Sequence, residues 1–107
     1  MADLMGMMKK AAELQSKMQA MQAELDTIEV EGSAGGGVVK VTLTGKGELR
    51  RVHVDDTLMK PQEKEILEDL LVTAHADARK KSESLVQEKM KVLTGGLPLP
   101  PGLKLFG

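Results

Sequence analysis

The side chains best suited to chemistry are basic residues in two separate segments, where they could bind phosphate groups. Lys10 and Lys17 are one heptad apart, so on a helix they share one edge, and Lys9 lies beside them. Residues 79–91 contain five basic and two acidic residues, whereas residues 63–77 contain five acidic residues and one lysine. The complete set of candidate phosphate-binding residues is Lys9, Lys10, Lys17, Arg79, Lys80, Lys81, Lys89 and Lys91.

The same basic residues also have a purely structural interpretation. Glu13 and Glu24 lie close to the first group, which would then form a solvated flank of a helix. In the second segment acidic residues precede basic ones, an order that the helix dipole favours. Lys80 and Lys91 nevertheless fall nearly opposite the apolar stripe of that segment, where a ligand could reach them. The residues alone leave both interpretations open.

A third basic group, formed by Lys46, Arg50 and Arg51, favours a structural role. Strand alternation places Arg50 and Arg51 on opposite faces of a sheet, so they cannot act as one clamp. We expect Arg51 to pair with Glu29 or Glu31 across an exposed face.

Other motifs that could carry chemistry are incomplete. The glycine-rich run 32–37 precedes VVKVTLT, which predicts a strand, whereas a phosphate-binding loop requires a helix N-terminus directly after it. Neither His53 nor His75 has a second histidine or a cysteine at ligand spacing. The chain has no cysteine, and no serine lies in a G-x-S-x-G motif. We therefore predict no catalytic residue, no metal and no cofactor in a protein that is not an enzyme.

The composition fits one domain, residues 1–107, whose interior needs a partner. Phe106 is the only aromatic residue, so a core built from aliphatic residues and eight methionines should be thin. The lack of aromatics also argues against stacking of single-stranded bases. The formal charge of −1 means that attraction to nucleic acid must come from local patches. Without a secretory signal or a run of about 18 apolar residues, we expect a cytoplasmic protein with no membrane contact and no small-molecule substrate.

Hydrophobic spacing predicts a long helix followed by three strands. Over residues 4–27 the apolar positions alternate spacings of three and four, the heptad pattern of a coiled coil. Over residues 28–54 the period changes to two, which predicts a three-stranded antiparallel meander with turns at 32–37 and 45–47. In the third strand, Val52 and Val54 should face inward. The apolar positions of the first helix, with the residue that follows it, are Leu4, Met7, Ala11, Leu14, Met18, Met21, Leu25 and Ile28.

A second long helix and a short tail complete the chain. Pro61 suits the first turn of a helix over residues 61–93, and Gly95-Gly96 ends it. The Pro/Gly-rich tail, residues 95–107, should be extended, either against a neighbour or loose.

The predicted helices are too long for the predicted sheet. The first helix would measure about 37 Å and the second about 50 Å. A sheet of three strands is only about 14 Å wide, and its strands reach about 23 Å. The helices must therefore project from the sheet, and a second copy of the chain is expected to cover their apolar stripes.

Four runs in order along the chain resemble the YbaB/EbfC family of bacterial nucleoid-associated proteins. They are MMKKAAELQSKMQAMQAEL (7–25), EVEGSAGGGVVKVTLTG (29–45), LEDLLVTAHADARKK (67–81) and GGLPLPPGLKLF (95–106). The resemblance implies an α+β fold with the order α-β-β-β-α and a tweezer-like homodimer. It also implies binding of double-stranded DNA with low sequence selectivity in the bacterial nucleoid, with effects on nucleoid compaction or gene expression and without enzymatic activity.

The resulting hypothesis is a cytoplasmic homodimer that binds duplex DNA through phosphates with basic residues of its projecting helices. The alternative is a coiled-coil chaperone or protein-interaction adaptor whose methionine-lined helices clasp another protein. Steeply salt-dependent DNA association would favour the first function, and salt-insensitive suppression of aggregation would favour the second.

Overall fold

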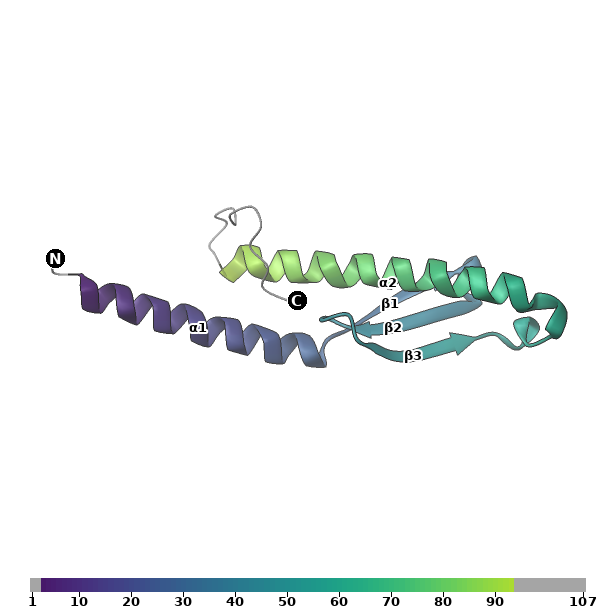
Figure 1. The fold of residues 1–107 in the computed structure, drawn as a ribbon, viewed down its shortest axis with the longest axis horizontal. Helices are drawn as coiled ribbons and strands as arrows, with labels where there is room; N and C mark the ends of the chain where they lie inside the picture. Colours follow the sequence, from purple (N-terminus) through teal and green to yellow (C-terminus); the bar gives the residue numbers. More distant parts are fainter. Residues whose placement is uncertain (1–2, 94–107) are drawn as a thin grey trace.

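The computed structural model describes residues 3–93, which form an elongated α+β molecule (Figure 1). The predicted order of elements, a long helix, three strands and a second long helix, is confirmed. Short 3-10 turns at Gly35–Gly37, Asp56–Leu58 and Pro61–Glu63 separate some of these elements. The main elements are α1 (Leu4–Thr27), β1 (Glu29–Ala34), β2 (Val39–Thr44), β3 (Leu49–Val54) and α2 (Lys64–Leu93). The predicted extended tail, residues 95–107, lies outside the described residues.

The molecule is long because the two helices outreach the sheet. Its extents are 72 × 25 × 19 Å and its radius of gyration is 19.2 Å, whereas a compact domain of this length has a radius of gyration near 13 Å. Figure 1 shows α1 and α2 running in opposite directions, with α1 continuing well past the end of α2. This projection agrees with the length argument made from the sequence.

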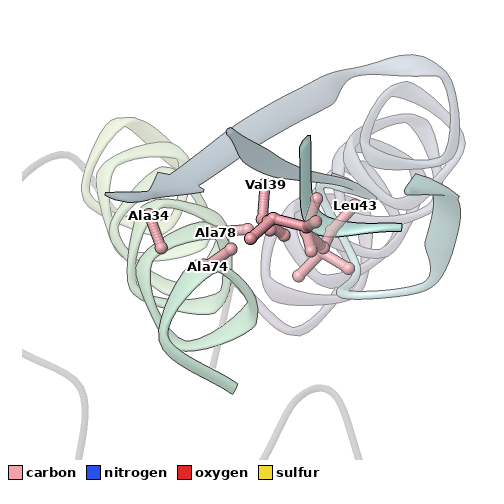
Figure 2. Packing of buried hydrophobic residues seen from close by; sticks show 7 residues of the cluster. Ala34, Val39, Leu43, Ala74 and Ala78 are labelled. Atoms are coloured by element: carbon pink, nitrogen blue, oxygen red, sulfur yellow. The ribbon is translucent and has the colours of Figure 1, made fainter. Parts of the chain in front are cut away.

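The three strands form one antiparallel sheet in the order β1-β2-β3, and α2 covers the first two strands. Val39, Val41 and Leu43 alternate along β2 towards α2, and all three are buried. They pack with Ala34 of β1 and with the small residues Ala74 and Ala78 of α2, as Figure 2 shows. The main core is therefore a thin layer between one helix and two strands.

The contact between β1 and α2 is close enough to require glycine at position 32. A Cβ atom on Gly32 would lie 2.2 Å from the backbone nitrogen of Ala78 and 2.3 Å from the carbonyl oxygen of Ala74. Our prediction of a turn over residues 32–37 is wrong for its first half, because β1 continues through Ala34. Only Gly35–Gly37 form the turn, and each of these glycines has a positive φ.

A second, smaller cluster attaches the C-terminal half of α1 to the end of α2. Met21 and Leu25 of α1 are buried against Met90 of α2. Leu25 also packs against Gly45 in the turn between β2 and β3, where an added Cβ would lie 2.7 Å from the Leu25 Cδ2 atom. The hydroxyl of Ser82 on α2 donates a hydrogen bond to the Gly45 carbonyl oxygen at 3.2 Å. The C-terminal half of α1, the β2–β3 turn and the end of α2 thus pack together, and we call this contact the joint.

Strand β3 remains largely uncovered. Val52 lies opposite Val41, so it occupies the same face of the sheet as the core residues, as we predicted. It is not buried, however, but 45% exposed, because α2 lies over β1 and β2 only. Val54 is half-buried at the edge of the core, whereas Leu49 is exposed like Val52. The core face of the sheet therefore ends in a bare apolar strip at β3.

Candidate nucleic-acid interface

The eight candidate phosphate-binding residues lie along both helices rather than in one pocket. Lys9 and Lys10 are on the part of α1 that projects beyond the end of α2, whereas Lys17 lines a groove beside that end, and all three are exposed. The other five lie on the second half of α2, from the level of the sheet to the last helical turn. The structure therefore distributes positive charge along both long helices, α1 and α2.

The side chains of four of these residues form no hydrogen bond or ion pair with any other residue of the range 3–93. They are Lys9, Lys10, Lys17 and Lys80. An exposed ammonium group without a hydrogen-bonded or ion-paired partner is available to an external anion. Of the four, Lys80 also acts on the Asp77 carboxylate and helps to lower the pKa of that group. These four lysines are thus the residues with the most available positive charge among the eight.

Lys81 has an internal role instead, because it closes the outer edge of β1. Its ammonium group donates to the Glu31 carbonyl oxygen at 2.7 Å and lies 3.4 Å from the Asp77 carboxylate. Asp77 in turn accepts a hydrogen bond from the Ser33 N–H at 3.1 Å. That hydrogen bond holds the pKa of the Asp77 carboxyl below its usual range, and Lys81 acts in the same direction. Backbone groups that would otherwise be an open sheet edge are thereby satisfied by α2 side chains.

Lys89 and Arg79 also have carboxylate partners. The Lys89 ammonium lies 2.7 Å from the Glu24 carboxylate, which links the end of α2 to α1. Arg79 pairs with Glu83 one turn later on α2 at 3.1 Å, and both side chains are exposed. An exposed ion pair of this kind contributes about 0–1 kcal/mol to stability, so an incoming phosphate could displace it at little cost.

In the third basic group, Lys46 and Arg50 anchor α1 to the sheet, and Arg51 links β3 to β1. Lys46 pairs with the Asp26 carboxylate at 3.1 Å, and Arg50 donates to the Asp26 carbonyl oxygen at 3.3 Å. Arg51 pairs with Glu29 at 2.6 Å, which confirms the predicted partner. Its hydrogen bond lowers the pKa of the Glu29 carboxyl.

The position of Arg50 could not be read from strand alternation. In the pairing of β2 with β3, Thr42 lies opposite Arg51 and Leu43 lies opposite Leu49, so Arg50 is an extra residue. Such a bulge redirects the side chain. Here it allows Arg50 to bond the last turn of α1.

A groove of about 580 Å³ between the β2–β3 turn and α2 contains basic groups but offers a poor anion site. Lys46 and Arg79, which line it, are both engaged with carboxylates. The N–H groups of Lys46, Gly47 and Glu48 all donate to atoms of Thr44. The turn therefore has no spare N–H group to bind a phosphate.

The described part of the chain also lacks a metal-binding cluster. Within residues 3–93 no group of three or more His, Cys, Asp or Glu side chains could hold a metal ion. His53 lies on β3 and His75 on α2, separated in the fold as in the sequence. Over the same residues, neither long helix is apolar enough to cross a membrane.

The fold and the distribution of charge define a class: a small, elongated α+β protein with exposed lysines along its two long helices. A sequence model described as the YbaB/EbfC DNA-binding family matches residues 1–97. The chain belongs to this family, which is not an enzyme family. The resemblance found in the four sequence runs is thereby confirmed.

The chain is similar to curated bacterial proteins over nearly its whole length. It is 66% identical over 105 residues to a nucleoid-associated protein of Rhodopseudomonas palustris (strain BisB5), covering 98% of this chain and 99% of that protein. It is 63% identical over 105 residues to a nucleoid-associated protein of Nitrobacter hamburgensis, with the same coverage of both chains.

A solved structure supports the fold. The crystal structure of an uncharacterized protein from Helicobacter pylori aligns with a TM-score of 0.78 and 22% identity. The alignment covers 87% of this chain and 98% of that one. At this identity the likeness concerns the arrangement of helices and strands alone.

Proposed function

We propose that this protein is a nucleoid-associated homodimer that binds double-stranded DNA chiefly through phosphates, with low sequence selectivity. The observation that carries the proposal is the combination of family membership with lysines on a projecting helix that lack internal partners. The nucleoid-associated relatives support the same location in the bacterial cell for this chain. Effects on nucleoid compaction and gene expression would follow from binding many sites weakly.

The proposed contacts are electrostatic rather than base-specific. Lys9, Lys10, Lys17 and Lys80 are the primary phosphate contacts, and Arg79, Lys81, Lys89 and Lys91 supply the surrounding positive charge. If four to six phosphates are contacted per dimer, the logarithm of affinity should fall with the logarithm of salt concentration with a slope of about −4 to −5.

Fluorescence anisotropy with two unrelated duplexes of equal length tests this proposal. We expect similar affinities for the two duplexes at each salt concentration and the steep slope just given. A slope near zero, or strong binding to only one of the two sequences, would refute phosphate-dominated binding.

The proposed homodimer is supported by the bare strip on β3. Leu49 and Val52 continue the apolar face of the core beyond the edge of α2. Between residues 3 and 93, no hydrogen bond from a helix or loop closes the outer edge of β3, in contrast to β1. An open edge beside an apolar strip is a site at which a second copy can add both hydrogen bonds and burial.

Two charge substitutions on β3 distinguish a specific loss of the dimer interface from a general loss of stability. Val52→Asp places a carboxylate on the apolar strip and should convert the dimer to monomer in light scattering coupled to size exclusion. His53→Asp is the matched control, because it lies next in the chain but on the polar face, opposite Lys40. A dimer that persists in Val52→Asp, or is lost equally in both variants, would contradict an interface on the strip.

The exposed methionines Met5, Met7 and Met8 favour the alternative function, a clasp for another protein. Suppression of aggregation of a denatured test protein, insensitive to salt, would be the signature of that function. Measuring the salt dependence of DNA binding and the suppression of aggregation on the same preparation decides between DNA binding and the protein clasp.

A further inference from the structure

The apolar stripe of α1 changes abruptly where α2 ends. Met21 and Leu25 are buried by the end of α2, whereas Leu4, Met7 and Leu14 continue the same stripe in the open. Met7 is 66% exposed and Leu14 is 45% exposed. Within residues 3–93, nothing covers the stripe from residue 4 to residue 14.

We propose that the C-terminal segment of the same chain, residues 97–106, docks along this bare part of α1. The last described residue, Leu93, packs against the cluster of Met21 and Leu25. α2 runs antiparallel to α1, and its end points along the N-terminal half of α1 (Figure 1). Leu93 therefore lies at the point where the bare part of the stripe begins.

The length of the segment suits the length of the stripe. From Met21 to Leu4 the helix rises about 26 Å at its usual pitch. Thirteen residues after Leu93, in the extended form that prolines favour, reach about 40 Å. The segment can thus follow the whole stripe with slack for bends at glycine.

The chemistry of the segment also fits. It contains one charged side chain, Lys104, and five large apolar residues. Its prolines cannot add to a sheet or continue a helix, which leaves docking of side chains onto an apolar surface as its means of burial. The five apolar residues are Leu97, Leu99, Leu103, Leu105 and Phe106.

A groove at the end of α2 marks the start of the proposed path. It has a volume of about 260 Å³ and lies between the two helices, lined by Met21, Val92 and Leu93 together with Lys17 and Lys89. Its lining is mainly apolar, and charged side chains flank it. The proposed docking path runs through this groove before it reaches Leu14.

The segment's own chain is favoured over a second copy because of effective concentration. A segment tethered this close to its site experiences an effective concentration on the order of millimolar, which a copy outside the proposed dimer does not match at ordinary protein concentration. The docked segment would leave Lys9 free, since this residue is on the opposite side of α1 from the stripe. The inference therefore does not depend on DNA binding.

Disulfide trapping tests the position of the segment, and the absence of native cysteine makes the result unambiguous. The test variant is Ala11→Cys with Gly102→Cys, which joins the stripe to the segment. The control is Ser16→Cys with Gly102→Cys, because Ser16 is exposed on the opposite side of α1 and closer to where the segment begins. A segment that does not dock would therefore react with the control position at least as fast.

We expect an intrachain disulfide that forms several-fold faster in the Ala11 variant than in the Ser16 variant under mild oxidation. Equal rates would overturn the proposal. A disulfide-linked dimer as the main product of the Ala11 variant would also overturn it, because the segment would then lie on a second copy.

Hydrogen exchange provides an independent readout that needs no cysteine. Ending the chain after Gly96 should raise amide exchange over residues 4–17 several-fold, while exchange in β1 and β2 stays unchanged. Unaltered exchange in residues 4–17 would refute docking, and faster exchange throughout the molecule would refute a local effect of the segment.

Discussion

The two halves of α1 carry the same hydrophobic pattern but have different surroundings. In the C-terminal half, Met21 and Leu25 are buried by the end of α2 and the β2–β3 turn. In the N-terminal half, Leu4 and Met7 occupy equivalent positions and are exposed. The comparison teaches that the heptad pattern specifies a helix with an apolar stripe, whereas the length of the neighbouring helix decides how much of that stripe one chain can cover.

Charged residues follow the same division. Near the C-terminal half, Glu24 bonds Lys89, while Asp26 bonds Lys46 and Arg50. In the N-terminal half, the lysines have no such partners among the described residues. One half of α1 is thus fixed to the domain, and the other half presents both apolar and positive groups outward.

The largest expected difference between the halves concerns the removal of a leucine side chain. Leu25→Ala should destabilise the fold by about 3 kcal/mol, because Leu25 is fully buried and its loss leaves a cavity in the joint. Leu14→Ala, the matched change in the bare half, should cost about 1 kcal/mol or less, because Leu14 is 45% exposed. Urea unfolding of both variants at one protein concentration measures the two costs, and equal costs would contradict the division of α1.

A somewhat smaller contrast is expected for glycine to alanine substitutions. Gly45→Ala should destabilise by about 2 kcal/mol, since the new Cβ would lie 2.7 Å from the Leu25 Cδ2 atom and 3.0 Å from the Leu25 carbonyl oxygen. Gly6→Ala meets only Asp3 at an ordinary 3.8 Å and should stabilise the helix by about 0.5–1 kcal/mol. The midpoint of thermal unfolding should thus fall for Gly45→Ala and rise for Gly6→Ala. A rise in both variants would mean that the atoms around Gly45 can move to accommodate the added methyl group.

The lysines of the bare half provide the third test, on binding rather than stability. Lys10→Gln with Lys17→Gln should reduce affinity for a duplex about tenfold at low salt and make the log-log salt slope shallower by about 2. The control, Lys60→Gln with Lys64→Gln, removes the same charge from two exposed positions, one at the start of α2 and one just before the 3-10 turn that precedes it. Equal weakening by both variants would show that net charge, and not the projecting helix, governs DNA binding.

Local pattern was sufficient to predict the main helices and strands, except that residues 61–63 of the predicted second helix form a 3-10 turn and α2 begins at Lys64. The spacing of apolar residues gave the bounds of α1 without error, and alternation placed Val39, Val41 and Leu43 on one face of β2. These features depend on residues close together in the chain, where periodicity is informative.

Features that depend on distant residues were not predictable from the sequence. Gly32 was predicted to form a turn because its tight approach to Ala74 and Ala78 cannot be seen locally. Val52 was assigned to the correct face of the sheet, but its exposure depends on where α2 lies. The bonding of Lys81 to Glu31 likewise joins residues that only the fold brings together.

The sheet repeats the contrast between a covered and a bare region, and a pH experiment probes its covered edge. Asp77 accepts a hydrogen bond from the Ser33 N–H at the edge of β1, and this bond lowers the pKa of the Asp77 carboxyl. A carboxyl whose pKa is lower in the folded state stabilises the fold at neutral pH and loses this contribution as pH falls through the folded pKa. Asp77→Asn should therefore be slightly less stable than the wild type at pH 7.

The effect should be the smallest of the four, because the Asp77 side chain is 39% exposed and solvent weakens its interactions. The difference in unfolding free energy between the wild type and Asp77→Asn should shrink as pH is lowered from the carboxyl's ordinary pKa of 3.8 downwards. Urea unfolding at pH 7 and at pH 3 measures this change. A difference that is the same at both pH values would mean that the shape of the side chain, and not its charge, closes the edge of β1, and the contrast with the open edge of β3 would then rest on hydrogen-bond geometry alone.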